Sequence, residues 1–232
     1  MPSITFNHFK GANTKLDEKS KLYLQLDKSD DKELIRHLKY VKLPNLRYIY
    51  LRSFEINDMN VKQFMAYSFP QKLHAFQFSL WNGGCQSITN IISTLIPCLK
   101  AITNEIVISG CMINSEELSQ LVQNSKHCNR FKINGCKLTI DTDIDFSNED
   151  QYSVKFLSFR ITGRSDRSDW GKNKSDMKAV MKAISQSSLK SSLEEINVHD
   201  CQVTIQEVEQ ALKDNGVDDN IKVTDNDSPL LI

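Results

Sequence analysis

The sequence of 232 residues lacks the features that mark several large classes of protein. Its 29 Lys and Arg are balanced by 29 Asp and Glu, so it has no excess of positive charge with which to hold nucleic acid. It has no run of about 18 apolar residues, which a membrane-spanning helix needs. Residues 1–10 lack the basic and then apolar order of a secretory signal. We therefore expect a cytoplasmic or nuclear protein that binds neither nucleic acid nor membrane.

Glycine and proline are also scarce, with 8 and 5 residues. No segment has the low complexity or the block of like charges that is typical of a linker or a disordered region. The sequence therefore predicts a single domain over residues 1–232. Within it we expect fraying over residues 1–20 and over the acidic, Pro-containing residues 225–232, because chain ends make few contacts.

The six cysteines have no CxxC spacing, and without a secretory signal we do not expect a disulfide framework. Three of them occupy the same place in similar segments. These are residues 106–113 (IVISGCMI), 131–138 (FKINGCKL) and 196–203 (INVHDCQV). Each segment has two apolar residues in strand alternation, a small or polar pair, the Cys and another apolar residue. The sequence therefore contains an internal repeat.

This repeat resembles the leucine-rich repeat, whose core pattern is L-x-x-L-x-L-x-x-N/C-x-L. The resemblance implies an α/β solenoid with short parallel strands on its concave side and helices on its convex side. Residues 165–170 (SDRSDW), followed by a helix entry that contains Asn, also resemble a loop of uncharacterised leucine-rich repeat proteins of protists. That resemblance extends from about Leu43 to the C-terminus and implies the same solenoid but no known activity. In such a unit the buried Cys turns the chain and offers a weak thiol donor to loop carbonyls.

Less regular copies of the unit extend the repeat in both directions. We expect strands at 22–26, 46–51, 73–78 and 154–159, a helix at 30–38, and a last strand within 216–223. Hydroxyl residues followed by acids predict helix starts at Ser115 and Thr204. The positions equivalent to the Cys are 54, 81, 111, 136, 162 and 201. Their spacing favours repeats of the ribonuclease-inhibitor-like type. The longest interval marks an insertion, the loop 162–175, before a helix near 177–184.

No catalytic or metal-binding motif is complete. The glycines before Lys172 are too widely spaced for a phosphate loop. The calcium-like run from Asp141 has Phe146 where Gly is required. His199 and Cys201 do not form a nucleophilic pair, because the repeat assigns Cys201 to the turn. We therefore predict no catalytic residue, no metal, no cofactor and no enzyme activity.

The residues that alternate with the buried ones are expected on the concave side, where they form a ribbon that is aromatic and basic at first and acidic at its end. Tyr and Arg are enriched at binding hot spots. The predicted partner-binding residues on the ribbon are Tyr48, Tyr50, Arg52, Lys132 and Arg160. In the alternative interpretation, Tyr48 and Tyr50 only cover the N-terminal end of the stack. The basic strands of the ribbon predict a partner with an acidic segment.

The loop 162–175 is a second predicted contact, through Arg164, Arg167 and Trp170. Equally, Asp166 and Asp169 could cap the next turn while Trp170 covers the core edge. The favoured function is a non-catalytic protein-binding adaptor or scaffold, either a monomer or part of a larger assembly. The alternative is a regulator similar to leucine-rich repeat activators of small GTPases, with Arg164 or Arg167 acting in trans on phosphoryl transfer.

Overall fold

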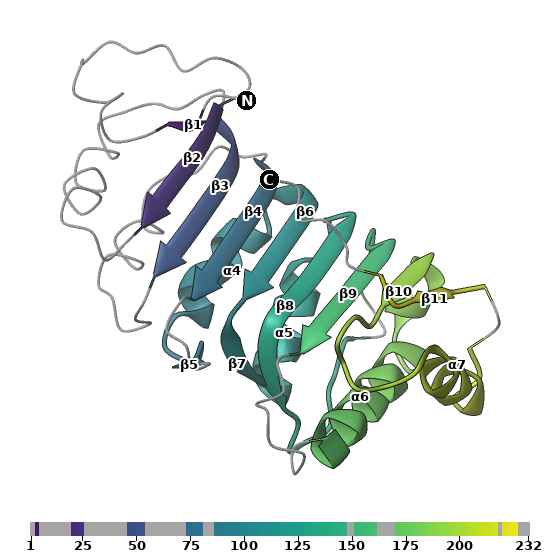
Figure 1. Cartoon of the computed structure of the whole chain (residues 1–232). Helices are drawn as coiled ribbons and strands as arrows, with labels where there is room; N and C mark the ends of the chain where they lie inside the picture. Colours follow the sequence, from purple (N-terminus) through teal and green to yellow (C-terminus); the bar gives the residue numbers. More distant parts are fainter. Residues whose placement is uncertain are drawn as a thin grey trace, which may run out of the picture.

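Parallel strands lie side by side in the order in which they follow one another along the chain (Figure 1). The computed structural model describes residues 3–4, 20–25, 46–53, 73–80, 86–147, 151–161, 170–217 and 220–226. The order of the strands in the main sheet is β1-β2-β3-β4-β6-β8-β9-β10-β11. Their bounds are Ser3–Ile4 (β1), Ser20–Gln25 (β2), Leu46–Ser53 (β3), Leu73–Leu80 (β4), Ile102–Ser109 (β6), Arg130–Thr139 (β8), Phe156–Ile161 (β9), Glu195–Asn197 (β10) and Lys222–Thr224 (β11).

Two further short strands pair beside the end of β8, which continues past the main sheet. They are β5 (Gln86–Ser87) and β7 (Cys111–Asn114), and the pairing order is β5-β7-β8. The expected α/β class with a parallel sheet is confirmed.

Apolar residues in strand alternation build the core on one face of the sheet. Because the strands are in register, equivalent residues stack in ladders from strand to strand. One ladder contains Leu51, Phe78, Ile108, Ile133 and Phe159, and all five side chains are buried. The predicted equivalence of Ile108 and Ile133 is therefore confirmed.

In the described part of the chain, the helices lie on the core side of the sheet (Figure 1), and their buried residues join those of the strands in one apolar cluster. Their bounds are Ile92–Leu99 (α4), Ser115–Asn124 (α5), Trp170–Ser185 (α6) and Ile205–Asp214 (α7), with a short 3₁₀ helix η2 at Ser188–Ser191. Among the described residues, no helix combines the length and the apolar composition that crossing a membrane requires.

Helices α5 and α7 begin with the same capping arrangement. The Thr204 side chain accepts the Glu207 backbone N–H, and the Glu207 carboxylate accepts the Thr204 N–H, as the sequence predicts for this helix. In α5 the cap is Asn114 rather than Ser115. The Ser115 hydroxyl instead accepts the backbone N–H of Asp141. Helix α5 therefore begins at Ser115, as predicted, and its cap is the residue before, because Asn is as good a cap as Ser.

An extended segment takes the place of a helix after β8. In its described part, residues 140–147, backbone groups bond to the side chains of successive turns of α5. The Ser119 hydroxyl accepts the Asp145 N–H, and the Gln123 amide donates to the Asp145 carbonyl. This segment contains the calcium-like run, whose Asp145 carboxylate caps the Ser147 N–H. The Asp145 carboxylate of this run therefore already accepts a hydrogen bond within its own turn.

Several sequence predictions need correction. Ile161, not residue 162, pairs with Cys136, because β8 has an irregularity between Asn134 and Cys136 that shifts the register. Helix α6 begins at Trp170, so the predicted loop is shorter than 162–175. Strand β1 was not expected within the first 20 residues, but it pairs with β2. The predicted helix at 30–38 and the positions 54 and 81 lie outside the described residues.

Candidate functional site

One face of the main sheet carries no helix in the described part of the chain (Figure 1). We call it the helix-free face, and the strand register arranges its side chains in three rows. The first row is Tyr48, Ala75, Glu105, Arg130, Phe156, Glu195 and Lys222; the middle row is Tyr50, Gln77, Val107, Lys132, Ser158, Asn197 and Thr224; the third row is Arg52, Ser79, Ser109, Asn134 and Arg160. A parallel sheet is usually covered on both faces by helices. The polar character of these rows suits instead a face that contacts solvent or a partner.

A buried ion pair lies near the middle of this face. Lys132 Nζ is 2.8 Å from Glu105 Oε1, and both residues are only 3% exposed. Arg130 Nε lies 3.6 Å from the same carboxylate oxygen, and its guanidinium stacks 3.9 Å from the centre of the Phe156 ring. Lys132 was predicted to contact a partner, but its side chain is buried beside Glu105 in this structure. The register brings Glu105 of β6 beside β8, and the pair is buried with its charges neutralised.

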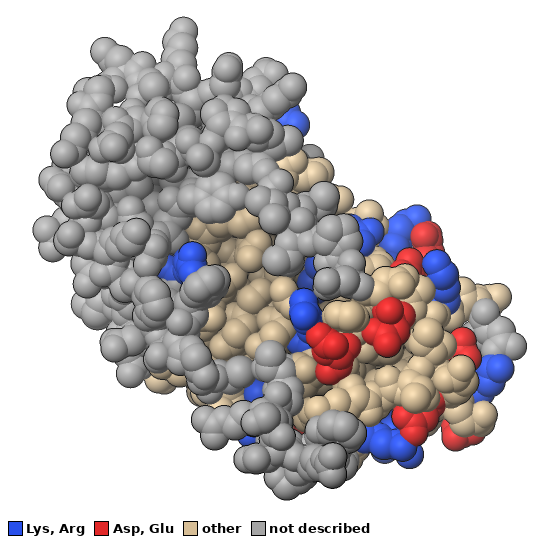
Figure 2. All heavy atoms as spheres, viewed as in Figure 1, with Lys and Arg blue, Asp and Glu red and all other residues tan. Residues whose placement is uncertain are grey.

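Two cations at or next to β9 also pair with carboxylates, but all four side chains of these pairs are at least 44% exposed. Lys155 Nζ lies 2.6 Å from Glu194 Oε1, and Arg160 Nη2 lies 3.1 Å from Asp200 Oδ2. Figure 2 shows the result: acidic and basic side chains lie next to one another over β9 to β11, while the described surface over β4 and β6 is mostly uncharged. The basic strands that favoured an acidic partner are therefore balanced by acids of the neighbouring strands. Pairing of this kind depends on the strand register, which the sequence does not display.

The aromatic part of the face lies over β3 and β4. Tyr48 and His74 meet edge to face with their ring centres 5.2 Å apart. Tyr48, Tyr50 and Arg52 are each half-buried, while His74 is exposed. The structure thus brings the three predicted residues of β3 together on one face with His74, as the sequence suggests. Whether they bind a partner stays a prediction.

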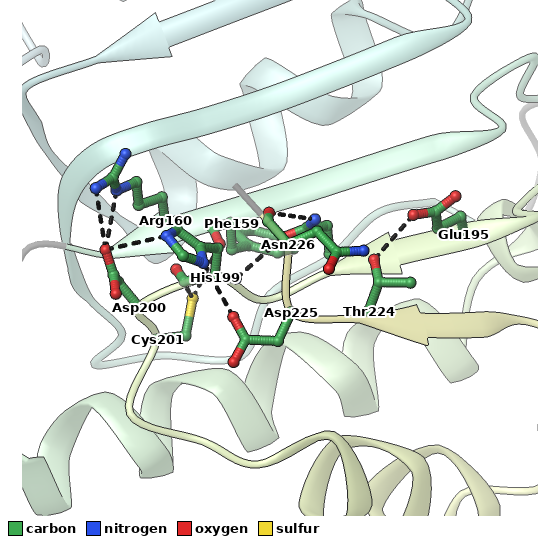
Figure 3. A network of polar contacts seen from close by, with 10 residues as sticks. Phe159, Arg160, Glu195, His199, Asp200, Cys201, Thr224, Asp225 and Asn226 are labelled. Atoms are coloured by element: carbon green, nitrogen blue, oxygen red, sulfur yellow. Dashed lines mark hydrogen bonds and ion pairs between the residues drawn. The ribbon is translucent and has the colours of Figure 1, made fainter. Parts of the chain in front are cut away.

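A chain of polar contacts joins the ends of β9, β10 and β11 (Figure 3). Nε and Nη2 of Arg160 both contact Asp200 Oδ2, at 3.1 Å each. His199 stands between two carboxylates: its Nε2 is 3.4 Å from Asp200 Oδ2, and its Nδ1 is 3.0 Å from Asp225 Oδ1. Asp225 is the first residue of the segment that was predicted to fray, and that prediction stays untested. The four side chains form one rim cluster, in which Arg160 is 44% exposed.

The backbone of the rim cluster is strained at Asp200, whose φ is +56°. The equivalent positions of the two preceding Cys units are Gly110 and Gly135, with φ of +70° and +61°. Glycine adopts this left-handed conformation at no steric cost, whereas other residues do so with strain. The repeat therefore requires a left-handed residue before each Cys. Asp200 meets that requirement less well than Gly while supplying the carboxylate that Arg160 and His199 contact.

The Cys of each unit behaves as the resemblance predicts. Cys111, Cys136 and Cys201 are at most 1% exposed, and their thiols donate to backbone carbonyls. For Cys201 the acceptor is Phe159 O at 3.0 Å. Burial raises the pKa of the Cys201 thiol to about 12. The burial and the thiol hydrogen bonds of the three cysteines favour a structural role.

The predicted second contact is only partly described. Trp170 is the first residue of α6 rather than a loop residue, while Arg164 and Arg167 lie outside the described residues. Sequence reasoning missed Asp200 and Asp225 as site residues. A signal for Asp200 was present, because V-H-D-C replaces I-S-G-C and I-N-G-C at a position where the other units have Gly. Among the described residues, no group of three or more His, Cys, Asp or Glu is arranged to hold a metal ion.

Comparisons with protein-family models, with curated proteins and with solved structures found no match for this chain.

Proposed function

We propose that this chain is a leucine-rich repeat solenoid of the ribonuclease-inhibitor-like type that binds a protein partner on its helix-free face and catalyses no reaction. The assignment is supported by strands that pair in chain order and by the equivalent buried Cys in three units. In such a stack each unit buries its apolar side against its neighbours, so one sheet face is left for binding.

The observation that carries the binding function is the composition of the helix-free face. A parallel sheet with one polar, helix-free face spans seven strands from β3 to β11. At about 4.8 Å per strand this gives a surface roughly 29 Å across, which suits a peptide or the edge of a domain. Tyr48, Tyr50 and His74 at one end supply large rigid side chains of the kind that dominate binding energy. The rim cluster supplies charge at the other end.

The charge of the partner is harder to infer than the surface on this chain that the partner would contact. The expected acidic partner now depends on Arg52 and Arg130, because Lys132 is buried beside Glu105. Arg130 keeps 35% of its side chain exposed. A partner carboxylate could reach it without opening the buried pair. An acidic segment in the partner therefore stays part of the proposal.

The test is a comparison of two variants in affinity capture followed by mass spectrometry. The face variant carries Tyr50→Ser, His74→Ala and Arg160→Ser, and it leaves the buried Lys132 in place. The matched control carries three substitutions at exposed helix positions: Glu116→Ser, Lys182→Ser and Glu209→Ser. Proteins that bind the parent and the control but not the face variant, and whose purified forms bind the parent directly, would support the proposal. Equal capture by both variants would contradict it.

A further inference from the structure

Helices α6 and α7 lie side by side on the core side of the sheet (Figure 1), and a shallow groove runs between them. The apolar side chains that line the groove are Met177, Met181, Val203, Val208 and Ala211. Met177, Met181 and Val208 are at most 2% exposed, so they form its floor. Val203 and Ala211 are half-buried and form its rim. The apolar core therefore reaches the surface between these two helices.

The size of the groove limits what it can hold. Its open space is at most about 210 Å³, part of which is bulk solvent. Sites for small molecules usually measure about 300–1,000 Å³ and enclose most of their ligand. This groove therefore suits a single apolar side chain of another protein better than a metabolite or a cofactor. Methionine side chains, which form part of its floor, adapt their shape readily to such an insertion.

Cations flank the groove on the α6 side. Lys174 forms an ion pair with Glu207 of α7, and the Glu207 carboxylate also accepts the Thr204 N–H. Lys178 and Lys182 follow at intervals of four residues, so they lie on the same side of the helix as Lys174. Both are exposed, and among the described residues neither forms an ion pair. The charge of Glu207 is thus already balanced, while two neighbouring positive charges are not.

The other acids of the two helices do not balance these lysines. Asp176 is the one carboxylate of α6, and it is buried where it accepts the Ile140 N–H. Glu209 and Asp214 of α7 are exposed but do not line the groove. An apolar groove therefore lies beside two unpaired, exposed cations on this part of the surface.

We propose that the groove between α6 and α7 binds an acidic amphipathic helix of a second protein. An apolar side chain of that helix enters the groove, and two of its carboxylates pair with Lys178 and Lys182. The two lysines are separated by about 6 Å along α6, which is also the spacing of two acids four residues apart on the partner helix. A helix that lays its apolar face in a groove is a recurring mode of peptide recognition.

The charge of the site favours a protein segment over other occupants. Two lysines are fewer than the roughly four to eight clustered cations that recognise an anionic lipid surface. The balanced charge of the chain argues against nucleic acid.

The inference does not depend on the proposed function, because the groove lies on the side of the sheet opposite the helix-free face. In affinity capture, a protein that uses the groove would be lost from the control, which carries Lys182→Ser, and kept by the face variant. The failure of one proposal can therefore be told from the failure of the other.

Peptides selected against the full chain are the probe that tests the groove. They come from a phage-displayed library of peptides of about 16 residues, which is long enough to form a helix. Each selected peptide is synthesised with a fluorescent label, and its affinity is measured by fluorescence anisotropy. The groove variant is Lys178→Glu with Lys182→Glu. The matched control, Lys100→Glu with Lys222→Glu, makes the same change of charge at two exposed positions away from the groove.

We expect selected peptides in which two acids four residues apart stand beside an apolar residue. Their affinity should fall at least about tenfold in the groove variant, where like charges would face each other. It should stay unchanged in the control. Ala211→Leu fills the groove without changing the charge, and it should weaken the same peptides. In protein isotopically labelled at its Met methyl groups, these peptides should shift the NMR signals of Met177 and Met181 but not that of Met112 in β7.

The proposal is wrong if no selected peptide is weakened by both the groove variant and Ala211→Leu while shifting the signals of Met177 and Met181. It is also wrong if the groove variant instead loses binding to vesicles of phosphatidylserine and phosphatidylcholine, or to a DNA duplex. Those results would assign the lysines to a membrane or to nucleic acid. None of them bears on the helix-free face, which the face variant tests.

Discussion

Lys132 Nζ and Glu105 Oε1 lie 2.8 Å apart on the sheet face that no described helix covers, and both side chains are almost completely buried. A buried pair of this kind contributes little when complete, but it leaves a costly charge behind when one member is removed. Lys132→Met should therefore destabilise the protein by about 3–5 kcal/mol. Adding Glu105→Gln should recover about half of that loss. Urea unfolding of the two single variants and the double variant measures this, and a fully additive double variant would contradict the pairing.

Ile133 is fully buried in the ladder that joins neighbouring units. Ile133→Ala removes apolar contacts on both sides of β8 and leaves a cavity, so it should cost about 2–5 kcal/mol. Asp143→Ala, at an exposed position of the segment after β8, is the control and should change stability by less than about 0.5 kcal/mol. The free energies come from denaturant unfolding. An Ile133→Ala protein that unfolds at the same urea concentration as the parent would disprove the ladder.

Two opposing contributions to stability can be compared at Asp200. Its left-handed backbone destabilises the fold, and its carboxylate forms exposed ion pairs. Asp200→Gly relieves the left-handed strain, and the ion pairs that it removes are half-exposed and worth about 0–1 kcal/mol. Asp200→Ala removes the same pairs and keeps the strain. We expect the Gly variant to be more stable than the Ala variant by about 1 kcal/mol. Thermal unfolding of the three proteins decides this, and an Ala variant more stable than the Gly variant would show that Asp200 is not strained.

Because Asp176 of α6 is buried, we expect its carboxyl to lower the stability of the protein as the pH rises. The residue is 2% exposed, and burial raises the pKa of its carboxyl above 3.8, although Lys172 and the Ile140 N–H oppose the rise. A carboxyl with a raised pKa binds its proton more tightly in the folded state. The contribution of Asp176 to stability is therefore largest below the pKa of an unfolded Asp, and it falls as the pH rises through the folded pKa.

Asp176→Asn should remove that loss. The variant should gain stability relative to the parent as the pH is raised from about 4 to 7. Its amide oxygen can still accept the Ile140 N–H. Urea unfolding at several pH values measures the difference, with the exposed Asp143→Asn as control. A difference that does not change with pH would mean that the Asp176 carboxyl is not perturbed by burial.

The three Cys of the repeat should resist a water-soluble thiol reagent in the native protein. Cys111, Cys136 and Cys201 are at most 1% exposed. The thiolate is the reactive form, and burial suppresses it. Mass spectrometry after short labelling should find these three unmodified, and modified once the protein is denatured. Fast native labelling of all three would remove the basis of the repeat.

The sequence was informative wherever a residue's role depends on its own unit. The alternation around Ile108 and Ile133 predicts their burial, and the Cys that follows each strand predicts the turn, because both are local patterns of one strand and its loop. The charge on the helix-free face could not be predicted in this way. Whether Lys132 is an exposed cation or half of a buried pair depends on Glu105, which comes from the preceding main-sheet strand and meets it only through the register.

One feature of the rim cluster could be predicted from the sequence, and another could not. The left-handed position of Asp200 follows from aligning it with Gly110 and Gly135, so its strain could have been inferred from the sequence. Its contact with Arg160 could not, because it requires the exact pairing of β9 with β10. The missed strand β1 and the early start of α6 at Trp170 were not predicted either. Strand β1 is defined by its pairing with β2 and not by local propensity, and nothing in the structure explains the early start of α6.

Hydroxyl-radical footprinting of the protein alone and in its complex with a captured, purified partner tests the central claim most directly. The method reports the solvent exposure of individual Tyr and His side chains. If the helix-free face binds the partner, oxidation of Tyr48, Tyr50 and His74 should fall in the complex. His127, which is exposed just after α5, should be oxidised as in the free protein. Unchanged oxidation of Tyr50 and His74 together with protection of His127 would contradict the account and would place the binding surface on the helices.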